Sequence, residues 1–492
     1  MNRKNVQAIS DPPGLTLFTQ SNILLAFCHA LRLIILLPAL TINTPMLIPD
    51  KNYTFHNWDH TLECHPRNFY QPRSEQEVVD IVRQVHDAGG TVRAFGAGHS
   101  WSALVLTDET LINLDRLNQL VAIDAARKRV TVQAGIRIKE LNQLLPAHGL
   151  GMANLGSIAE QSIAGATATG THGTGLRLGG LHTELVGIKL VTGEGKLLSL
   201  TEEQDSELMR AARVSLGTLG IVTEVTIQCV DDYNLEWKAW PLPFEEVLNG
   251  LPELINNNER VRLYWFAGTD VIQIMTMNHT DLPVTPKNRF KDWFTNIVVK
   301  HDFMKLLMET GYHFDHLPGL HVHVDATDDI NRFEAKVGWV REERVDRYNY
   351  ILNIPMPPEH QECEYAVPVA CAADAVRLTR RIIEANNYHV NLPIEVRFVA
   401  ADQSMLSPAY GQDVCYIGAY TFGAEFAAAF FAGFEPAMKS IGGRPHWGKH
   451  LTLTGAEARG LYPLYDRFNE IRRQLDPNGT FANGFIQTLF GP

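Results

Sequence analysis

Two charged residues lie two positions apart in an apolar, β-rich stretch, Leu392-Pro-Ile-Glu-Val-Arg-Phe-Val399. Side chains two apart on a strand point to the same face, so Glu395 and Arg397 are predicted to lie side by side. A guanidinium held in this way offers positive charge to a reaction that develops negative charge. The alternative is a buried structural ion pair, which would have no chemical role.

A glycine turn lies about three hundred residues earlier, at the end of the predicted strand that begins at Thr91. Its glycines can take positive φ and leave room for a ligand, while the freed amides can bind a phosphate. The spacing is not G-x-G-x-x-G, so a nicotinamide-binding Rossmann domain is excluded. The candidate cofactor-binding residues of this turn are Phe95, Gly96, Ala97, Gly98, His99 and Ser100.

A second glycine-rich stretch runs from Asn154 to Gly175 and consists mostly of small residues. Such a segment cannot fill a core by itself, so a flat, bulky ligand is expected to press on it. Its hydroxyls and amides can satisfy a diphosphate together with a polar ring, whereas the alternative is a loose linker. The candidates here are Gly156, Ser157, Ser162, Gly165, Thr169, Gly170, Thr171, His172 and Gly173.

The composition limits the kinds of partner. The chain has 492 residues, 45% of them hydrophobic, which is enough for two or three globular domains. Its net charge of −12, without an evident basic patch, argues against a nucleic-acid partner. Six cysteines occur without a Cys-x-x-Cys pair, which predicts neither a disulfide framework nor a zinc site and fits a reducing compartment.

A further histidine pattern could indicate a metal. His321, His323 and Asp325 alternate on a predicted strand and would share one face. With no further ligand cluster evident, we interpret this segment as a half-exposed strand and predict no metal.

The N-terminal segment has three interpretations. Residues 22–42 form a mostly apolar run of nearly the length of a membrane span, interrupted by His29, Arg32 and Pro38. It can be a membrane or interfacial anchor, a leader peptide, or the product of a start placed before the true one at Met46. The chain is accordingly expected to be cytoplasmic or membrane-associated.

The rest of the chain alternates helical and β patterns. Ser74 and Glu77 form a capping box before a helix that ends near Gly89, and a helix at 206–212 precedes a strand at 221–228. After residue 232 the strands lengthen and aromatic residues become more frequent. The predicted divisions are an extension (1–51), a cofactor-binding domain (52–232), a substrate or cap domain (233–440) and a C-terminal segment (441–492).

Several motifs together resemble a known family. The stretches at 95–100, 154–175 and 217–224 are similar to the FAD-binding domain of vanillyl-alcohol oxidase-type flavoproteins. The stretches at 392–399, 443–449 and 475–481 are similar to the aldonolactone oxidoreductases, which include L-gulonolactone oxidase, D-arabinono-1,4-lactone oxidase and plant L-galactonolactone dehydrogenase. The resemblance implies an α+β protein with a two-subdomain FAD-binding domain and a cap domain built on a large antiparallel sheet.

The resemblance also implies roles for individual residues. Arg397 would hold the lactone, Glu395 would orient Arg397 and the substrate hydroxyls, and Lys449 would be a cation near the flavin. Without that context a lysine after Trp-Gly is ordinarily a solvated loop residue, and His446 can equally be a packing partner of Trp447. The segment Glu364–Pro368 resembles a family segment and is interpreted as structural, and Ile221 and Val222 are expected to contact the cofactor.

Two positions bear on electron transfer. Family members with a histidine at the position of His99 generally bind FAD covalently through it, whereas the plant dehydrogenase has leucine there. The plant enzyme also has an alanine, thought to block oxygen, at the position of Gly156. The resemblance therefore favours oxidation of an aldono-1,4-lactone at C2, with O2 reduced to H2O2.

Three alternatives remain open. One is a lactone dehydrogenase that passes electrons to a quinone or cytochrome, and another is an alditol oxidase. A third is a binding or structural protein of the same fold that has lost the flavin.

Overall fold

The computed structural model describes residues 47–286, 331–332, 335–336, 341–354 and 359–491. The chain divides into two units, Met1–Met46 and Leu47–Pro492, and the described residues all belong to the second. The apolar run at 22–42 and the His321, His323, Asp325 pattern lie outside the described residues. Within the described part of the chain, no helix has the length and apolar character needed to cross a bilayer.

The first part of the fold contains two sheets. The smaller sheet is parallel, in the order β3-β5-β4, and helix α2 packs beside it. Ser74 Oγ accepts a hydrogen bond from the Glu77 backbone N–H at 3.2 Å, so the predicted helix start is confirmed. The bounds are β3 (Asn68–Tyr70), α2 (Glu75–Asp87), β4 (Val92–Phe95) and β5 (Thr110–Asn113).

The larger sheet of this part is antiparallel, in the order β10-β9-β11-β7-β6, and helices α3, α4 and α5 pack against it. The helix and strand predicted at 206–212 and 221–228 are confirmed. The bounds are β6 (Leu120–Asp124), β7 (Arg129–Gln133), α3 (Ile138–Leu144), α4 (Ile163–Ala168), β9 (Leu185–Val191), β10 (Leu197–Thr201), α5 (Ser206–Ala212) and β11 (Ile221–Gln228).

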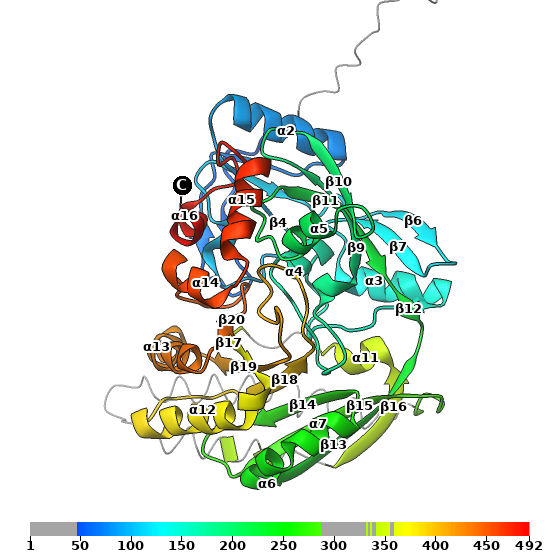
Figure 1. The fold of residues 1–492 in the computed structure, drawn as a ribbon, viewed down its shortest axis with the longest axis vertical. Helices are drawn as coiled ribbons and strands as arrows, with labels where there is room; N and C mark the ends of the chain where they lie inside the picture. Colours follow the sequence, from blue (N-terminus) through cyan, green and yellow to red (C-terminus); the bar gives the residue numbers. More distant parts are fainter. Residues whose placement is uncertain (1–46, 287–330, 333–334, 337–340, 355–358, 492) are drawn as a thin grey trace, which may run out of the picture. The chain divides into compact units, whose positions relative to one another are not determined.

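The second part is an eight-stranded sheet, in the order β16-β13-β15-β14-β18-β19-β17-β20. Helices α6, α7, α12 and α13 lie along one of its faces (Figure 1). The strands are β13 (Asn234–Pro243), β14 (Arg260–Trp265), β15 (Val271–Thr280), β16 (Glu342–Arg347), β17 (Gln361–Pro368), β18 (Ile394–Val399), β19 (Val414–Thr421) and β20 (Arg444–Pro445). The helices are α6 (Phe244–Asn249), α7 (Leu251–Asn257), α12 (Ala372–Asn386) and α13 (Ala424–Ser440).

The two faces of this sheet differ in chemistry because its strands alternate. In β18, Ile394, Val396 and Phe398 belong to the core beneath the helices, so Glu395 and Arg397 point to the opposite face. Strands β14, β17 and β19 repeat the pattern with apolar residues toward the helices. A group of polar side chains therefore gathers on the other face. Arg262, Glu362, Glu364, Glu395, Arg397 and Tyr416 are buried there, and Tyr264 and Tyr420 are half-buried.

The remaining elements are short. The C-terminal helices α14 (Gly455–Leu461), α15 (Tyr465–Leu475) and α16 (Gly484–Phe490) share the core of the larger N-terminal sheet. The others are β1 (Phe55–His56), β2 (Glu63–Cys64), β8 (Leu150–Gly151), β12 (Val230–Asp231), α11 (Tyr348–Leu352) and the 3₁₀ turns at Ala103–Val105, Leu145–His148, Leu181–Glu184 and Val369–Cys371. The mixture of helices with a large antiparallel sheet agrees with the predicted α+β class, whereas the domain boundaries stay predictions.

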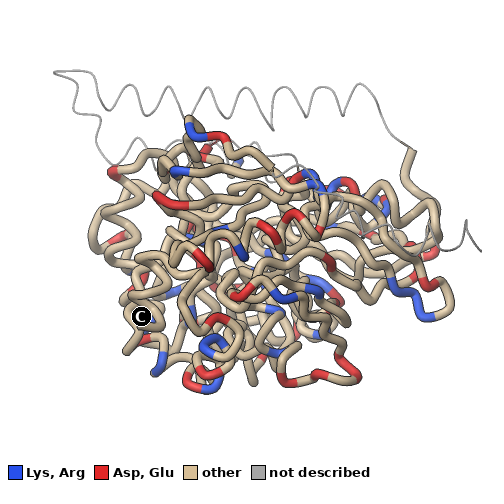
Figure 2. The backbone as a smooth tube through the Cα atoms, turned by 90° about the horizontal axis from the view of Figure 1, so that it is seen from above, with Lys and Arg blue, Asp and Glu red and all other residues tan. Residues whose placement is uncertain are grey.

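Lysines and arginines alternate with aspartates and glutamates along the described backbone in the view of Figure 2. Among the described residues five cysteines are unpaired, and four of them are buried.

Arg93 on β4 joins segments that are far apart in the sequence. Its buried guanidinium donates hydrogen bonds to four backbone carbonyls, at distances from 2.7 to 3.0 Å. Two of the acceptors lie in the 216–217 turn, one is Leu104 and one is Phe481 in the C-terminal segment. Burial lowers the pKa of Arg93 to about 10, so the group stays charged at neutral pH.

We expect Arg93→Met to destabilise the protein strongly, because four buried carbonyls would lose their donor. At about 1–3 kcal/mol for each unsatisfied buried group, a loss of at least about 3 kcal/mol is expected. The midpoint of thermal unfolding measures this effect. Arg116→Met, at an exposed position, is the control and should change stability by less than about 0.5 kcal/mol. Equal midpoints for the two variants would contradict the role of Arg93.

Candidate active site

Two cavities meet beside the glycine turn. The first has an empty volume of about 1150 Å³ and the second about 1000 Å³. Both are lined by His99, Ser100, Gln161 and Thr169, so these residues form the boundary at which the two cavities join. Together they offer one elongated space, with a polar, charged end in the first cavity.

The glycine turn lines the second cavity, but only partly for the predicted reason. Gly98 has φ +70°, as expected of a glycine turn. Gly96 does not have positive φ. It is required because a Cβ there would lie 1.9 Å from Ser162 Oγ, so the turn could not approach α4.

Most of the predicted cofactor-binding residues line one of the two cavities. All six residues of the turn, with Ser162, Gly165, Thr169, Ile221 and Val222, line the second, and Gly156, Ser157, Thr169, Thr171 and His172 line the first. Gly170 and Gly173 line neither cavity. Gly170 closes the turn after α4, and a Cβ at Gly173 would lie 2.1 Å from Asn154 Oδ1, so both serve the packing of the loop.

His99 is the predicted attachment point. It lines both cavities, and its Nδ1 is buried and makes no hydrogen bond to a described residue. Burial, with the positive charges of Lys449 and Arg137, lowers its pKa to about 4. The ring is therefore neutral at physiological pH, the form in which an imidazole is a nucleophile.

Glu395 and Arg397 both line the first cavity and are buried. The Glu395 carboxylate accepts hydrogen bonds from the Tyr264 and Tyr420 hydroxyls, and Arg262 Nε lies 3.2 Å from it. Arg397 Nε lies 3.7 Å from the same carboxylate. Burial would raise the pKa of Glu395, but the two arginines outweigh this effect and lower it, so the group stays ionised.

Glu364 is a second partner of Arg397. Arg397 Nη2 donates a hydrogen bond of 2.7 Å to Glu364 Oε1 from across strand β19. Burial acts in the opposite direction, but the guanidinium holds the pKa of Glu364 well below its usual range. Glu364, which was interpreted from the sequence as structural, lines the first cavity.

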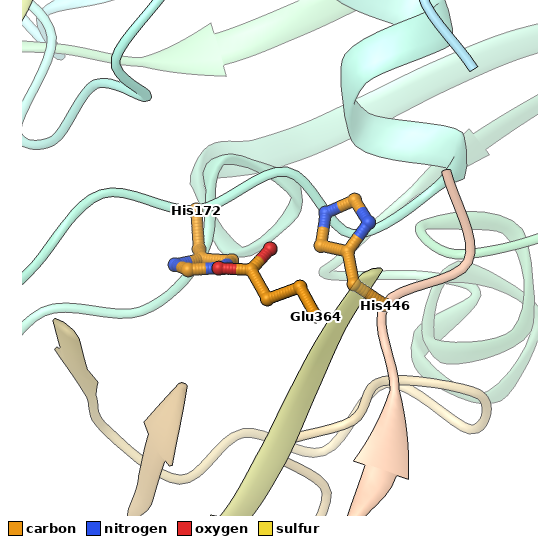
Figure 3. Close-up of side chains that lie close together, drawn as sticks. All are labelled: His172, Glu364 and His446. Atoms are coloured by element: carbon orange, nitrogen blue, oxygen red, sulfur yellow. The ribbon is translucent and has the colours of Figure 1, made fainter. Parts of the chain in front are cut away.

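Glu364, His172 and His446 lie close together (Figure 3), and all three line the first cavity. His172 Nδ1 donates to the Gly173 carbonyl at 2.9 Å, and the His172 ring stacks on Tyr416. His446 Nδ1 accepts from the Gly448 N–H at 3.1 Å, so the neutral ring carries its proton on Nε2.

These hydrogen bonds argue against a metal ion in this group, although its ligand-type atoms lie within 4.8 Å of one another. The protonated Nε2 of His446 has no lone pair to offer, so only two buried atoms without a hydrogen-bond partner among the described residues, His172 Nε2 and Glu364 Oε2, are left as ligands in this group. Burial lowers the pKa of both histidines, which therefore stay neutral beside Arg397.

Lys449 also lines the first cavity, and two residues hold it. Its ammonium group donates to Glu362 Oε2 and lies 4.7 Å from the centre of the Trp101 ring. The side chain is 18% exposed, against 4% for Glu362. Lys449 is thus not a solvated loop residue, and Glu362 is a site residue that the sequence analysis missed.

Comparisons with known proteins agree with this geometry. Residues 66–201 match the family described as FAD binding domain, and residues 225–489 match the family described as D-arabinono-1,4-lactone oxidase. An L-gulonolactone oxidase of Scyliorhinus torazame is 32% identical over 444 residues, which cover 89% of this chain and 98% of the relative. An L-gulono-1,4-lactone dehydrogenase of Mycobacterium tuberculosis is also 32% identical, over 89% of this chain and 99% of the relative.

The fold has a solved counterpart. A cholesterol oxidase from B. sterolicum superposes with a TM-score of 0.76 at 17% identity, over 92% of this chain and 99% of the other. This likeness shows the fold, and the two family matches together with the L-gulonolactone oxidase relative define an FAD-dependent oxidoreductase. The chain belongs to the D-arabinono-1,4-lactone oxidase family.

The residues around the cavities fit FAD. The second cavity has a glycine-lined wall at a turn and a helix start, which suits a diphosphate. His99, with its unpartnered buried Nδ1, stands where the two cavities join, and the cationic groups line the first cavity. The flavin ring is accordingly expected in the first cavity and the adenosine diphosphate in the second.

Proposed function

We propose that this chain oxidises an aldono-1,4-lactone at C2 and that O2 accepts the electrons. The observation that carries the proposal is the pair of buried residues Glu395 and Arg397, with the half-buried Lys449, in one cavity beside His99. Bound FAD would supply the hydride acceptor. The names of the relatives suggest L-gulono-, L-galactono- or D-arabinono-1,4-lactone as the substrate.

Each charged residue has a distinct task in this proposal. Arg397 is fixed by Glu364 and Glu395, so its guanidinium can bind the lactone oxygens without reorganising during the reaction. Lys449 is the more exposed cation and would bind the reacting hydroxyl. Glu395 cannot act as the base, because four donor groups already surround its carboxylate.

The test is a substrate panel with the purified full-length holoenzyme. The three lactones and xylitol are each supplied under air, and both H2O2 and the reduction of an artificial electron acceptor are measured. Peroxide formed in proportion to lactone supports the proposal. Reduction of the artificial acceptor without peroxide would indicate the dehydrogenase, and preference for xylitol would indicate an alditol oxidase. Flavin that no lactone reduces would contradict lactone oxidation.

Gly156→Ala tests the proposed access of O2. Gly156 lines the first cavity, and a Cβ there would lie 3.1 Å from Thr171 Cγ2, so the methyl group fits after a small shift. We expect the reaction of the reduced enzyme with O2 to slow by at least about tenfold, which is about 1.4 kcal/mol in barrier.

Stopped-flow mixing with O2 measures this step, and anaerobic reduction by lactone should be unchanged. Gly460→Ala is the matched control, because a Cβ there has no neighbour within 4 Å. Equal O2 reactivity in both variants would exclude Gly156 from the oxygen route.

Membrane association is a separate proposal, motivated by the apolar run at 22–42. If this run anchors the protein, full-length chain should remain with membranes after alkaline carbonate extraction, and Leu36→Arg should weaken that association. Recovery of the full-length protein in the extract would exclude an anchor.

A further inference from the structure

Three buried carboxylates surround the cationic groups of the first cavity, and they are not equivalent. Glu395 is paired with Arg262 and Arg397, and Glu364 is paired with Arg397. A guanidinium does not give up its proton in a protein, so both carboxylates are held ionised. Neither is able to take up a proton during the reaction.

Glu362 differs from these two in its partner. Its Oε2 accepts from the Lys449 ammonium, a group that can lose a proton, and its buried Oε1 has no hydrogen-bond partner among the described residues. The charged and titratable groups that face it are Lys449, Glu364 and Arg397, with the Tyr420 hydroxyl across the sheet. Burial raises the pKa of Glu362, and Glu364 acts in the same direction.

Cys363 is the other titratable neighbour on the same strand, but its side chain points into the core beneath the helices. Burial raises the pKa of this thiol well above its usual range, so it stays protonated and neutral.

The geometry also provides a route for a proton. Lys449 and Glu362 both line the first cavity and are in direct contact, and the Lys449 side chain is the more exposed of the two, at 18% against 4%. The Trp101 ring beside the ammonium group limits where Lys449 can move. A proton from the cavity can therefore reach Glu362 through Lys449.

We propose that Glu362 stores the hydroxyl proton of the substrate, which reaches it through Lys449. The inference rests on the proposed lactone oxidation. The C2 hydroxyl gives its proton to Lys449 Nζ as one Lys449 proton passes to Glu362 Oε2. The C2–H bond breaks and its electron pair leaves with the hydride to FAD, so C2 becomes a carbonyl and Glu362 becomes a neutral acid.

Charge balance favours this assignment. Before the reaction, three carboxylates (Glu362, Glu364 and Glu395) face three cations (Arg262, Arg397 and Lys449). Storing the proton on Glu362 leaves one net positive charge among these six groups. That charge compensates the negative charge that arrives with the hydride, so no uncompensated charge is buried.

The experiment is anaerobic reduction of the full-length holoenzyme by L-gulono-1,4-lactone, followed by stopped-flow absorbance as a function of pH. In wild type the rate should rise with pH as Glu362 loses its proton. In Glu362→Gln the rate at pH 7 should fall by about 10²-fold, a usual scale for a lost proton acceptor. Its pH profile should lack the rise that Glu362 causes in wild type.

Two variants separate proton storage from simple positioning of Lys449. Glu362→Asp keeps a carboxylate and should restore the wild-type pH profile at a reduced rate. Glu364→Gln alters a buried carboxylate on the same face of β17. It should lower the rate but keep the rise, moved to lower pH, because Glu364 helps to raise the pKa of Glu362. A Glu362→Gln profile parallel to wild type would overturn the proposal, as would an unchanged rate.

Infrared difference spectra give a readout that does not depend on rate. Reduction by lactone should produce the carbonyl stretch of a protonated carboxyl group, which Glu362→Gln should lack and Glu364→Gln should retain. The same band in wild type and Glu362→Gln would overturn the proposal. Wild-type flavin that the lactone does not reduce would instead reject the proposed function with this lactone.

Discussion

Replacing Arg397 by alanine should lower kcat/KM for the lactone by at least about 10²-fold. This is the scale on which enzymes lose rate when a preorganised group that stabilises developing charge is removed. The guanidinium lines the first cavity and is buried, so water cannot replace it at low cost. Steady-state kinetics with peroxide detection measures the loss, and anaerobic flavin reduction assigns it to the oxidation of the lactone.

The same substitution should also reduce stability, because Glu364 and Glu395 would lose their shared partner. Leaving one member of a buried ion pair uncompensated costs about 3–5 kcal/mol. Activity must therefore be compared at a temperature at which the variant is folded, with flavin content and the unfolding midpoint measured in parallel.

Arg262→Met is the matched control for Arg397→Ala. Arg262 pairs with the same Glu395 carboxylate at 3.2 Å and is equally buried, but it does not line the cavity. We expect a similar loss of stability with less than about a tenfold loss of kcat/KM. Arg397→Lys keeps the positive charge but lacks the planar set of guanidinium donors, so its kcat/KM should lie between those of wild type and Arg397→Ala. Wild-type kcat/KM in folded Arg397→Ala would remove Arg397 from the substrate site.

The sequence was sufficient to predict the pairing of Glu395 and Arg397, because strand periodicity depends on local spacing alone. The structure agrees, since Val396 between them and the flanking Ile394 and Phe398 belong to the core beneath the helices. The same period-2 signal was present at Glu362 and Glu364 on the apolar strand β17. The sequence alone does not show that these two glutamates lie near Glu395, because that depends on the register of the sheet. Strand β19 lies between β17 and β18, and its Gly418 is opposite Glu364 on one side and Glu395 on the other.

Contacts between distant segments could not be predicted in this way. Tyr264 lies opposite Glu395 only because β14 pairs with β18, across 131 residues of sequence. Gly96 was predicted to take positive φ and to leave room for a ligand, whereas in the structure the close approach that requires glycine is that of Ser162. In both cases the contacting residue belongs to a different segment of the chain, and tertiary packing, not the local sequence pattern, determines where that segment lies.

His99→Ala should abolish covalent attachment of the flavin. His99 stands where the two cavities join, and its buried Nδ1 has no hydrogen-bond partner among the described residues. Burial, with the positive charges of Lys449 and Arg137, lowers its pKa to about 4. The neutral imidazole, which is the nucleophilic form, therefore predominates at neutral pH and also in mildly acidic solution. Acid precipitation measures the bond: wild-type flavin should remain in the protein pellet, and His99→Ala flavin should pass into the supernatant.

The outcome of that experiment separates the covalent bond from cofactor binding itself. The glycine turn and α4, which line the second cavity, are unchanged in His99→Ala, so the variant should still bind FAD noncovalently and turn over more slowly. His148→Ala, at an exposed position, is the control and should retain its flavin in the pellet. Wild-type flavin that acid already releases would reject the bond to His99 while leaving FAD binding intact. Wild-type protein that never contains flavin would reject both, because the two cavities would then have no cofactor to position against Arg397 and Lys449.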